Sequence, residues 1–118
     1  MAVRELDARP AAYAHFPDTG EYRWLELGDG AVYGHAAFAE REDRLELHLS
    51  LTRWGGGVRR SLAGDLDWLK QEARRLGKAR IMGVRADGEG RFDERLFRFA
   101  RLYGFTETHV FQTASMEV

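Results

Sequence analysis

The sequence predicts an α+β fold, an α/β sandwich built on a central mixed sheet with helices on both faces. Two observations carry this prediction. Through residues 22–52, apolar residues alternate with polar ones, which is the period of strands that bury one face. From residue 62 onward, the apolar positions recur every three or four residues, which is the period of an amphipathic helix. A meander of strands followed by alternating helices and strands is typical of a sheet covered by helices.

The first half of the chain supplies the meander. In order, we expect a short strand, one or two helical turns after Pro10 and three longer strands, at residues 3–6, 11–16, 22–27, 31–40 and 44–52. The last of these strands alternates most regularly. Leucines occupy one face, and the other face is polar, with Glu46, His48, Ser50 and Thr52. These strands should pair in an antiparallel meander.

The second half alternates helices with strands. An apolar stripe from Leu62 to Leu76 predicts a helix that Gly77 ends, although Gly64 leaves its start open. A strand is expected over residues 79–86. A second helix is expected over 93–103, with Asp93 as its N-cap and Gly104 after its end. A final strand is expected around residues 109–113.

Composition limits the classes of protein. The 118 residues, of which 44% are hydrophobic, fit one domain, 1–118. The absence of cysteine excludes disulfides, thiolate zinc sites and iron–sulfur clusters, and no metal is expected. No apolar run approaches the roughly 20 residues of a membrane span, and the N-terminus lacks a signal-peptide pattern, so no membrane partner and a cytoplasmic location are expected.

Charge is nearly balanced overall but unevenly distributed. The net charge is −1, so binding to nucleic acid through the overall charge of the protein is not expected. Residues 1–52 carry five Arg against ten Asp and Glu, whereas residues 53–101 carry thirteen Arg and Lys against seven Asp and Glu. The basic half is therefore suited to a ligand with a few phosphates, or it is simply the solvated faces of helices.

A glycine-rich segment joins the regular strand to the first long helix. It reads Leu51-Thr52-Arg53-Trp54-Gly55-Gly56-Gly57-Val58-Arg59-Arg60. Glycines let backbone N–H groups approach a ligand, and a helix N-terminus adds unpaired donors and partial positive charge, which together make a phosphate cradle. Neither Gly-Lys-Ser/Thr nor Gly-x-Gly-x-x-Gly is present, which disfavours nucleoside triphosphates and dinucleotides. A plain flexible turn remains the alternative.

Residues 22–118 resemble the GNAT superfamily of acyl-CoA N-acyltransferases. The order of elements is the same, and Arg53-Trp54-Gly55-Gly56-Gly57-Val58 is similar to the family's diphosphate loop, Gln/Arg-x-x-Gly-x-Gly/Ala, except that Val58 replaces a small residue. Gly104-Phe105 matches the Gly-Phe that typically ends the family's second helix. The resemblance implies a coenzyme A site whose candidate residues are Leu51, Arg53, Gly55, Gly56, Gly57, Val58, Arg59, Arg60 and Asp93.

The chain also departs from the family. The tyrosine that often serves as general acid would fall at Ala100, and Asp93 stands where an asparagine often contacts the pantetheine arm. Tyr103 is the substitute acid candidate, with core packing as its alternative role. The N-terminal part, which usually helps to build the acceptor pocket, is short. We expect Trp24, Trp54 and Trp68 mostly in the core or an interface, with a contact to adenine as an alternative for Trp54.

Acyl transfer to an amine needs a base to remove a proton and donors for an oxyanion. Glu46 and His48 share the polar face of the strand that would carry the thioester, so they are the base candidates; solvent-facing or cross-strand roles are their alternatives. The resemblance implies an N-acyltransferase that uses an acyl-CoA, acetyl-CoA first, on a small-molecule or protein amine. The rival interpretation is a non-catalytic GNAT-like module that works through protein–protein contacts. A homodimer is a further possibility that the sequence leaves open.

Overall fold

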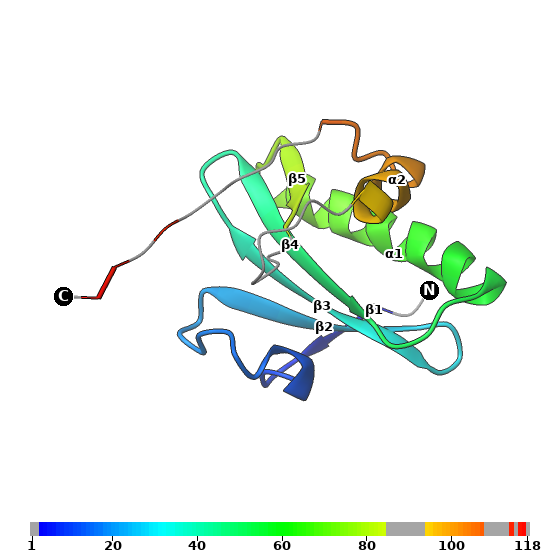
Figure 1. Ribbon diagram of the computed structural model, residues 1–118, viewed down its shortest axis with the longest axis horizontal. Helices are drawn as coiled ribbons and strands as arrows, with labels where there is room; N and C mark the ends of the chain where they lie inside the picture. Colours follow the sequence, from blue (N-terminus) through cyan, green and yellow to red (C-terminus); the bar gives the residue numbers. More distant parts are fainter. Residues whose placement is uncertain (1–2, 85–93, 108–113, 115, 118) are drawn as a thin grey trace. The chain divides into compact units, whose positions relative to one another are not determined.

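The computed structural model describes residues 3–84, 94–107, 114 and 116–117. The chain divides into two compact units, Met1–Val84 and Arg85–Val118, and each is described here by itself. The first unit contains, in order, β1 (Val3–Leu6), the short 3₁₀ helix η1 (Ala11–Tyr13), β2 (Tyr22–Gly28), β3 (Val32–Glu40), β4 (Arg44–Leu51), α1 (Gly56–Arg75) and β5 (Arg80–Gly83) (Figure 1). The second contains α2 (Glu94–Leu102).

The five strands form one mixed sheet in the order β1-β2-β3-β4-β5. β1 to β4 pair antiparallel with their neighbours, which is the predicted meander. The chain then crosses over through α1 and returns as β5, which pairs parallel with β4. A parallel neighbour requires such a crossover, and a helix usually provides it. The α+β class predicted from the sequence is therefore confirmed.

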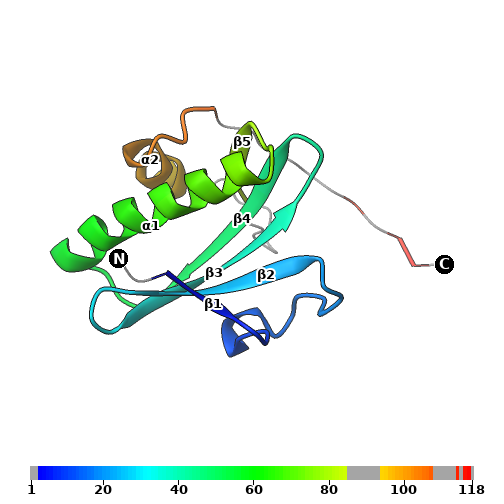
Figure 2. The ribbon, with the colours of Figure 1, turned by 180° about the vertical axis from the view of Figure 1, so that it is seen from behind.

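Helix α1 runs along one face of the sheet (Figures 1 and 2). Its stripe of Leu62, Leu66, Leu69 and Ala73 is buried, as its spacing predicts. The inward face of the sheet offers Leu25, Leu27, Phe38, Leu45 and Leu47 to the same core. Gly77, with φ +74, ends the helix: Lys78 N donates to Ala73 O at 2.8 Å.

A cluster of ion pairs fastens α1 to the sheet. Glu72 of α1, only 10% exposed, accepts hydrogen bonds from Arg23 of β2 at 2.6 Å and from Arg75. The guanidinium of Arg23 also bonds Glu5 of β1 and stacks 4.6 Å from the ring centre of Phe38. The hydrogen bond from Arg75 and then that from Arg23 outweigh burial and lower the pKa of Glu72 to about 2.

The opposite face of the sheet is covered by an aromatic cluster around η1. Tyr13 is buried against Trp24 and Ala37, and Phe16 and Tyr22 pack beside them. The hydroxyl of Tyr13 donates to the backbone oxygens of His35 and His48, both at 3.1 Å. Because these carbonyls belong to β3 and β4, one side chain anchors the N-terminal segment across two strands.

The second unit is described through α2 and the residues that follow it. Gly104, with φ +92, ends this helix, and Phe105 N donates to Ala100 O at 3.1 Å. The rings of Phe99 and Tyr103 lie 5.2 Å apart, which supports the packing role considered for Tyr103. The predicted N-cap Asp93 and the predicted strand at 109–113 lie outside the described residues.

Some sequence expectations need correction. Helix α1 starts at Gly56, so two of the three glycines are helical, and the predicted strand 79–86 is observed as Arg80–Gly83. Trp24 is buried and Trp68 is half-buried, but Trp54 is 50% exposed rather than in the core, because it belongs to the loop before α1. Within the described ranges, no helix is long and apolar enough to cross a membrane.

The Glu72 cluster predicts a pH-dependent stability. Since folding lowers the pKa of Glu72 from 4.5 to about 2, its contribution is complete above about pH 4.5 and is lost as the pH falls toward 2. Glu72→Gln should lower the free energy of unfolding at pH 7 by about 1–3 kcal/mol, because Arg23 and Arg75 lose a charged acceptor. Urea unfolding at pH 7 and at pH 2.5 measures both effects.

The matched control is Glu42→Gln, on the exposed turn between β3 and β4. It should change the free energy of unfolding little at either pH. The difference between Glu72→Gln and the parent should shrink at pH 2.5. A difference that stays the same at both pH values would contradict the assigned role of the carboxylate.

Candidate functional site

Strand β4 is paired on both sides for only part of its length. Its parallel pairing with β5 runs from Arg44 to Leu47, and Val84 N donates to Leu47 O at 2.9 Å. From His48 to Leu51, β4 pairs with β3 alone within the described residues. Because alternate residues of a strand direct their N–H and C=O groups to the same side, those of Leu49 and Leu51 point to this open side, as Leu47 does. The strand therefore offers backbone donors and acceptors there.

The open stretch of β4 leads into the glycine loop. Gly55 is the N-cap of α1 and, as a glycine, makes no side-chain cap; Arg59 N donates to Gly55 O at 2.9 Å. The N–H groups of the residues before Arg59 point out of the helix end, where the helix itself supplies no acceptor. Since Gly55, Gly56 and Gly57 are all exposed and carry no Cβ, a ligand can approach these donors closely.

The three residues that follow the glycines differ in what they offer to a ligand. Arg60 lies over the glycines: a Cβ placed on Gly56 would be 4.0 Å from its Nη1. Arg59 is exposed on the same turn. Val58, by contrast, is 1% exposed, so its side chain belongs to the core. Val58 stands where the family's diphosphate loop has a small residue, but its side chain points into the core and therefore does not obstruct the phosphate cradle.

The side chain of Arg53 is held in an ion pair. Its guanidinium makes a two-armed ion pair with Asp29 in the turn between β2 and β3, and donates to Ala31 O at 3.0 Å. The hydrogen bond from Arg53 lowers the pKa of Asp29, so this carboxylate stays ionised. The carboxylate also lies against the start of α1, since a Cβ on Gly57 would be 3.2 Å from its Oδ2.

Tyr33 contacts both the residue before the loop and helix α1 after it. Its backbone oxygen accepts hydrogen bonds from Thr52 N at 2.8 Å and Thr52 Oγ1 at 3.1 Å, just before the glycines. Its hydroxyl donates to the buried carboxylate of Asp65 on α1. Tyr33 lies at the bulge where the pairing shifts between Leu27 and Gly28, which allows this one residue to serve both contacts.

The base candidates meet on the other face of β4. Nε2 of His48 lies 2.8 Å from Oε2 of Glu46, and the hydroxyl of Tyr22 donates to the same oxygen at 3.1 Å. Arg41 donates to Oε1 of Glu46 at 3.3 Å. The ring of Phe16 meets that of His48 edge to face at 4.9 Å. Both side chains of the pair are less than one-fifth exposed, so their interaction is partly shielded from water.

This environment keeps the carboxylate of Glu46 ionised. Partial burial raises the pKa of Glu46, but the hydrogen bonds from His48, Arg41 and Tyr22 together lower it below its ordinary value. An ionised Glu46 accepts a hydrogen bond from Nε2–H of His48, so a neutral imidazole carries its hydrogen on Nε2 and its lone pair on Nδ1. Nδ1 is then the atom able to accept a proton.

The structure thus brings Glu46 and His48 together, and Leu51 leads from them to the loop of Gly55, Gly56 and Gly57. Tyr103 belongs to the second unit and remains a prediction, as does Asp93, outside the described residues. Sequence reasoning missed further residues, namely Tyr22 and Arg41 around Glu46, and Asp29, Tyr33 and Asp65 around the loop. The alternation of β2 places Tyr22 on the polar face, but only the pairing register brings it into line with Glu46, across Ala39 of β3.

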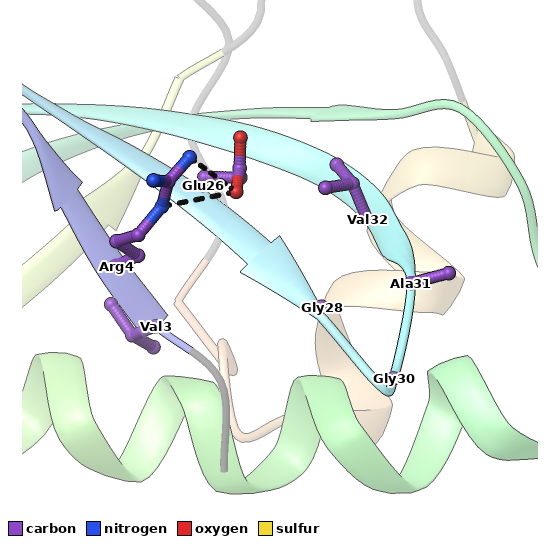
Figure 3. Close-up of a pocket in the computed structure, with 7 residues that line it drawn as sticks. All are labelled: Val3, Arg4, Glu26, Gly28, Gly30, Ala31 and Val32. Carbon is purple, nitrogen blue, oxygen red and sulfur yellow. Dashed lines mark hydrogen bonds and ion pairs between the residues drawn. The ribbon is translucent and has the colours of Figure 1, made fainter.

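A shallow pocket lies elsewhere, between β1 and the turn that joins β2 to β3 (Figure 3). Its polar side chains, Arg4 and Glu26, pair with each other at 2.8 Å, and the rest of its lining is glycine, alanine and valine. It therefore offers few groups to recognise a ligand. Among the residues with described positions, no three His, Asp or Glu side chains are grouped to hold a metal ion.

No family model and no curated protein matches the sequence. Solved structures do share its fold. An aminoglycoside acetyltransferase from an uncultured soil metagenomic sample, meta-AAC0020 in complex with sisomicin, has a TM-score of 0.60 and 13% identity, over 94% of this chain and 76% of its own. A provisionally assigned acetyl transferase from Pyrococcus furiosus has a TM-score of 0.60 and 15% identity, over 89% and 72%.

A provisionally assigned acetyltransferase from Agrobacterium tumefaciens str. C58 has a TM-score of 0.59 and 13% identity, over 98% of this chain and 100% of its own. The shared architecture confirms the GNAT fold that the sequence resemblance implied. At these identities the likeness concerns the fold, so the site must be argued from its own residues.

The contacts of Glu46 predict a measurable change in its pKa. Tyr22→Phe removes one hydrogen bond to the ionised carboxylate, which should raise the pKa of Glu46. NMR titration of the Glu46 carboxyl carbon measures the shift. Glu72, on helix α1, is the internal control, and its pKa should not change. An unchanged pKa of Glu46 in a folded variant would show that Tyr22 does not stabilise the charge.

Proposed function

We propose that this protein is an N-acyltransferase that transfers the acyl group of an acyl-CoA, acetyl-CoA in the first instance, to an amine. The observation that carries this proposal is the arrangement along β4. Strand β4 carries the hydrogen-bonded pair of Glu46 and His48, and the glycine loop that follows this strand leads to the start of helix α1. The GNAT fold supports the same interpretation.

The co-substrate would bind along this arrangement. Its diphosphate would accept hydrogen bonds from the first N–H groups of α1, with Arg60 supplying charge at its edge. Leu51 and Glu46 are five residues apart on β4, a distance of about 17 Å along an extended strand. The pantetheine arm, which has amide groups, would follow the open backbone of Leu49 and Leu51 over this distance. The thioester would then reach the Glu46–His48 pair.

The reaction would use His48 as base and Glu46 as the group that positions it. The amine nitrogen attacks the thioester carbonyl carbon, a C–N bond forms, and the C–S bond breaks to release the thiolate. Nδ1 of His48 takes the proton that the amine loses, and the ionised Glu46 stabilises the imidazolium that results. The N–H of Leu49 is a candidate donor to the oxyanion. Tyr103 stays the candidate acid for the thiolate.

We further propose an amine acceptor of small-molecule or protein origin. One structural neighbour was solved in complex with sisomicin and is an aminoglycoside acetyltransferase, which supports the small-molecule class. The acceptor would approach the aromatic side of the sheet, where Phe16 and Tyr22 flank His48. Aromatic faces attract cationic groups, which suits an amine that arrives protonated.

The alternative is a non-catalytic module that binds coenzyme A and acts through protein contacts. Two observations favour it. Glu46 is already bound by three side chains, as in a purely structural network, and Ala100 stands where the family often has its acid. This alternative shares the cradle with the enzyme proposal but predicts no turnover, so binding and catalysis need separate tests.

The first test concerns binding. Gly56→Glu places bulk and negative charge within the cradle and should weaken coenzyme A at least about tenfold in calorimetric titration. Gly64→Glu is the matched control, because Gly64 lies exposed on the same helix with open space around it. It should bind coenzyme A as the parent does. If folded Gly56→Glu also binds like the parent, the diphosphate does not lie in this loop.

The second test concerns turnover. Thiol release from acetyl-CoA should appear with at least one member of a broad amine panel and should rise with pH as the acceptor loses its proton. His48→Ala should lower kcat by about 10²–10⁴-fold with little change in coenzyme A affinity, and Glu46→Gln should lower it less. Ser50→Ala, on the same face of β4, should leave kcat nearly unchanged.

Two outcomes separate the candidate functions. Tight coenzyme A binding without acceptor-dependent thiol release favours the non-catalytic module. A His48→Ala variant that keeps the parent's kcat would instead show that another group removes the proton.

A further inference from the structure

We propose that Asp29 is an internal competitor of the co-substrate: in the free protein its carboxylate occupies Arg53, and it sets the affinity of the cradle by competing with the incoming diphosphate for that guanidinium. This inference rests on the proposed function. It concerns a residue of the turn between β2 and β3 that takes no part in the reaction proposed above.

The first support is geometric. Asp29 and Arg53 are 24 residues apart, yet both Nη atoms of Arg53 reach the carboxylate, with Nη1 3.3 Å from Oδ2. This two-armed geometry is the one that guanidinium groups also form with phosphates. While this ion pair is formed, the two Nη groups of Arg53 cannot bind another anion in the same way.

The second support is the position of the carboxylate relative to the helix start. Asp29 Oδ2 lies 3.2 Å from the place that a Cβ of Gly57 would take. A residue larger than glycine at position 57 would press on the carboxylate, so this glycine admits Asp29 to the edge of the loop. The positive end of α1 attracts Asp29 as it would attract a phosphate.

The third support is the charge balance of the loop. Among the described residues, Asp29 places a carboxylate against Gly57, and Arg53, Arg59 and Arg60 are basic residues of the same segment. Closing the Asp29–Arg53 pair cancels one of these three cations. Replacing the carboxylate by a neutral group should therefore return a full positive charge to the site.

Calorimetric titration of the full chain with coenzyme A tests the proposal. Asp29→Asn removes the charge but keeps the size of the side chain, and it should tighten coenzyme A by about twofold to tenfold at low salt. The gain should shrink as salt is added, since it is electrostatic. Pantetheine, which lacks the diphosphate, should bind Asp29→Asn and the parent equally.

Two further variants separate competition from other effects. Asp67→Asn makes the same change of net charge on an exposed part of α1, and should not alter the affinity for coenzyme A. Arg53→Gln should weaken binding more in the Asp29→Asn background than in the parent, because only the freed guanidinium can contact the ligand. Thermal unfolding should show Asp29→Asn slightly less stable while it binds more tightly.

A pair that only fastens the loop would differ in the affinity: Asp29→Asn would then lower the affinity for coenzyme A as well as the stability. Equal or weaker binding by folded Asp29→Asn, beside a parent that binds coenzyme A, overturns the competition and leaves the proposed function standing. Failure of both proteins to bind coenzyme A overturns the proposed function and this inference with it. An equal gain in Asp67→Asn would show an effect of net charge and would also overturn it.

Discussion

The strict alternation of β4 is the constraint on which the rest of the structure depends. Its buried leucines build the core beneath α1, and Glu46 and His48 consequently share the opposite face. A shift of one residue in register would exchange the two rows and place a carboxylate in the core. The burial of Leu45 and Leu47 thus also places Glu46 and His48 on the same face, where their side chains form a hydrogen bond of 2.8 Å.

The bulge at Leu27 and Gly28 is the local irregularity that connects this regular sheet to the loop. It adds one residue to β3, and that residue, Tyr33, reaches Thr52 before the glycines and Asp65 within α1. A glycine loop on its own is flexible and pays entropy when it binds a ligand. The contacts of Tyr33 with Thr52 before the loop and with Asp65 in α1 reduce the number of conformations that the loop can adopt, while the glycines themselves remain exposed.

The sequence predicted what periodicity can report. It gave the meander, the helix that Gly77 ends and the shared face of Glu46 and His48, because these follow from local spacing. It did not reveal that Asp29 pairs with Arg53 or that Tyr22 bonds Glu46, because each of these pairs is 24 residues apart in sequence and meets only through strand pairing. The predicted strand bounds, 22–27 and 31–40, leave Asp29 between two strands, but nothing local showed where its carboxylate would point. Val58 was similarly counted with the loop, although it packs in the core.

The exposure of Trp54 has a spectroscopic consequence. Of the three tryptophans, Trp24 is buried and Trp68 half-buried, whereas Trp54 is 50% exposed beside Gly55. An indole in contact with water emits at longer wavelength than one in a core, so the red edge of the emission spectrum belongs mainly to Trp54. Because a purine stacked on an indole quenches it, this chain carries a natural fluorophore at the loop that can report occupancy in real time without a label.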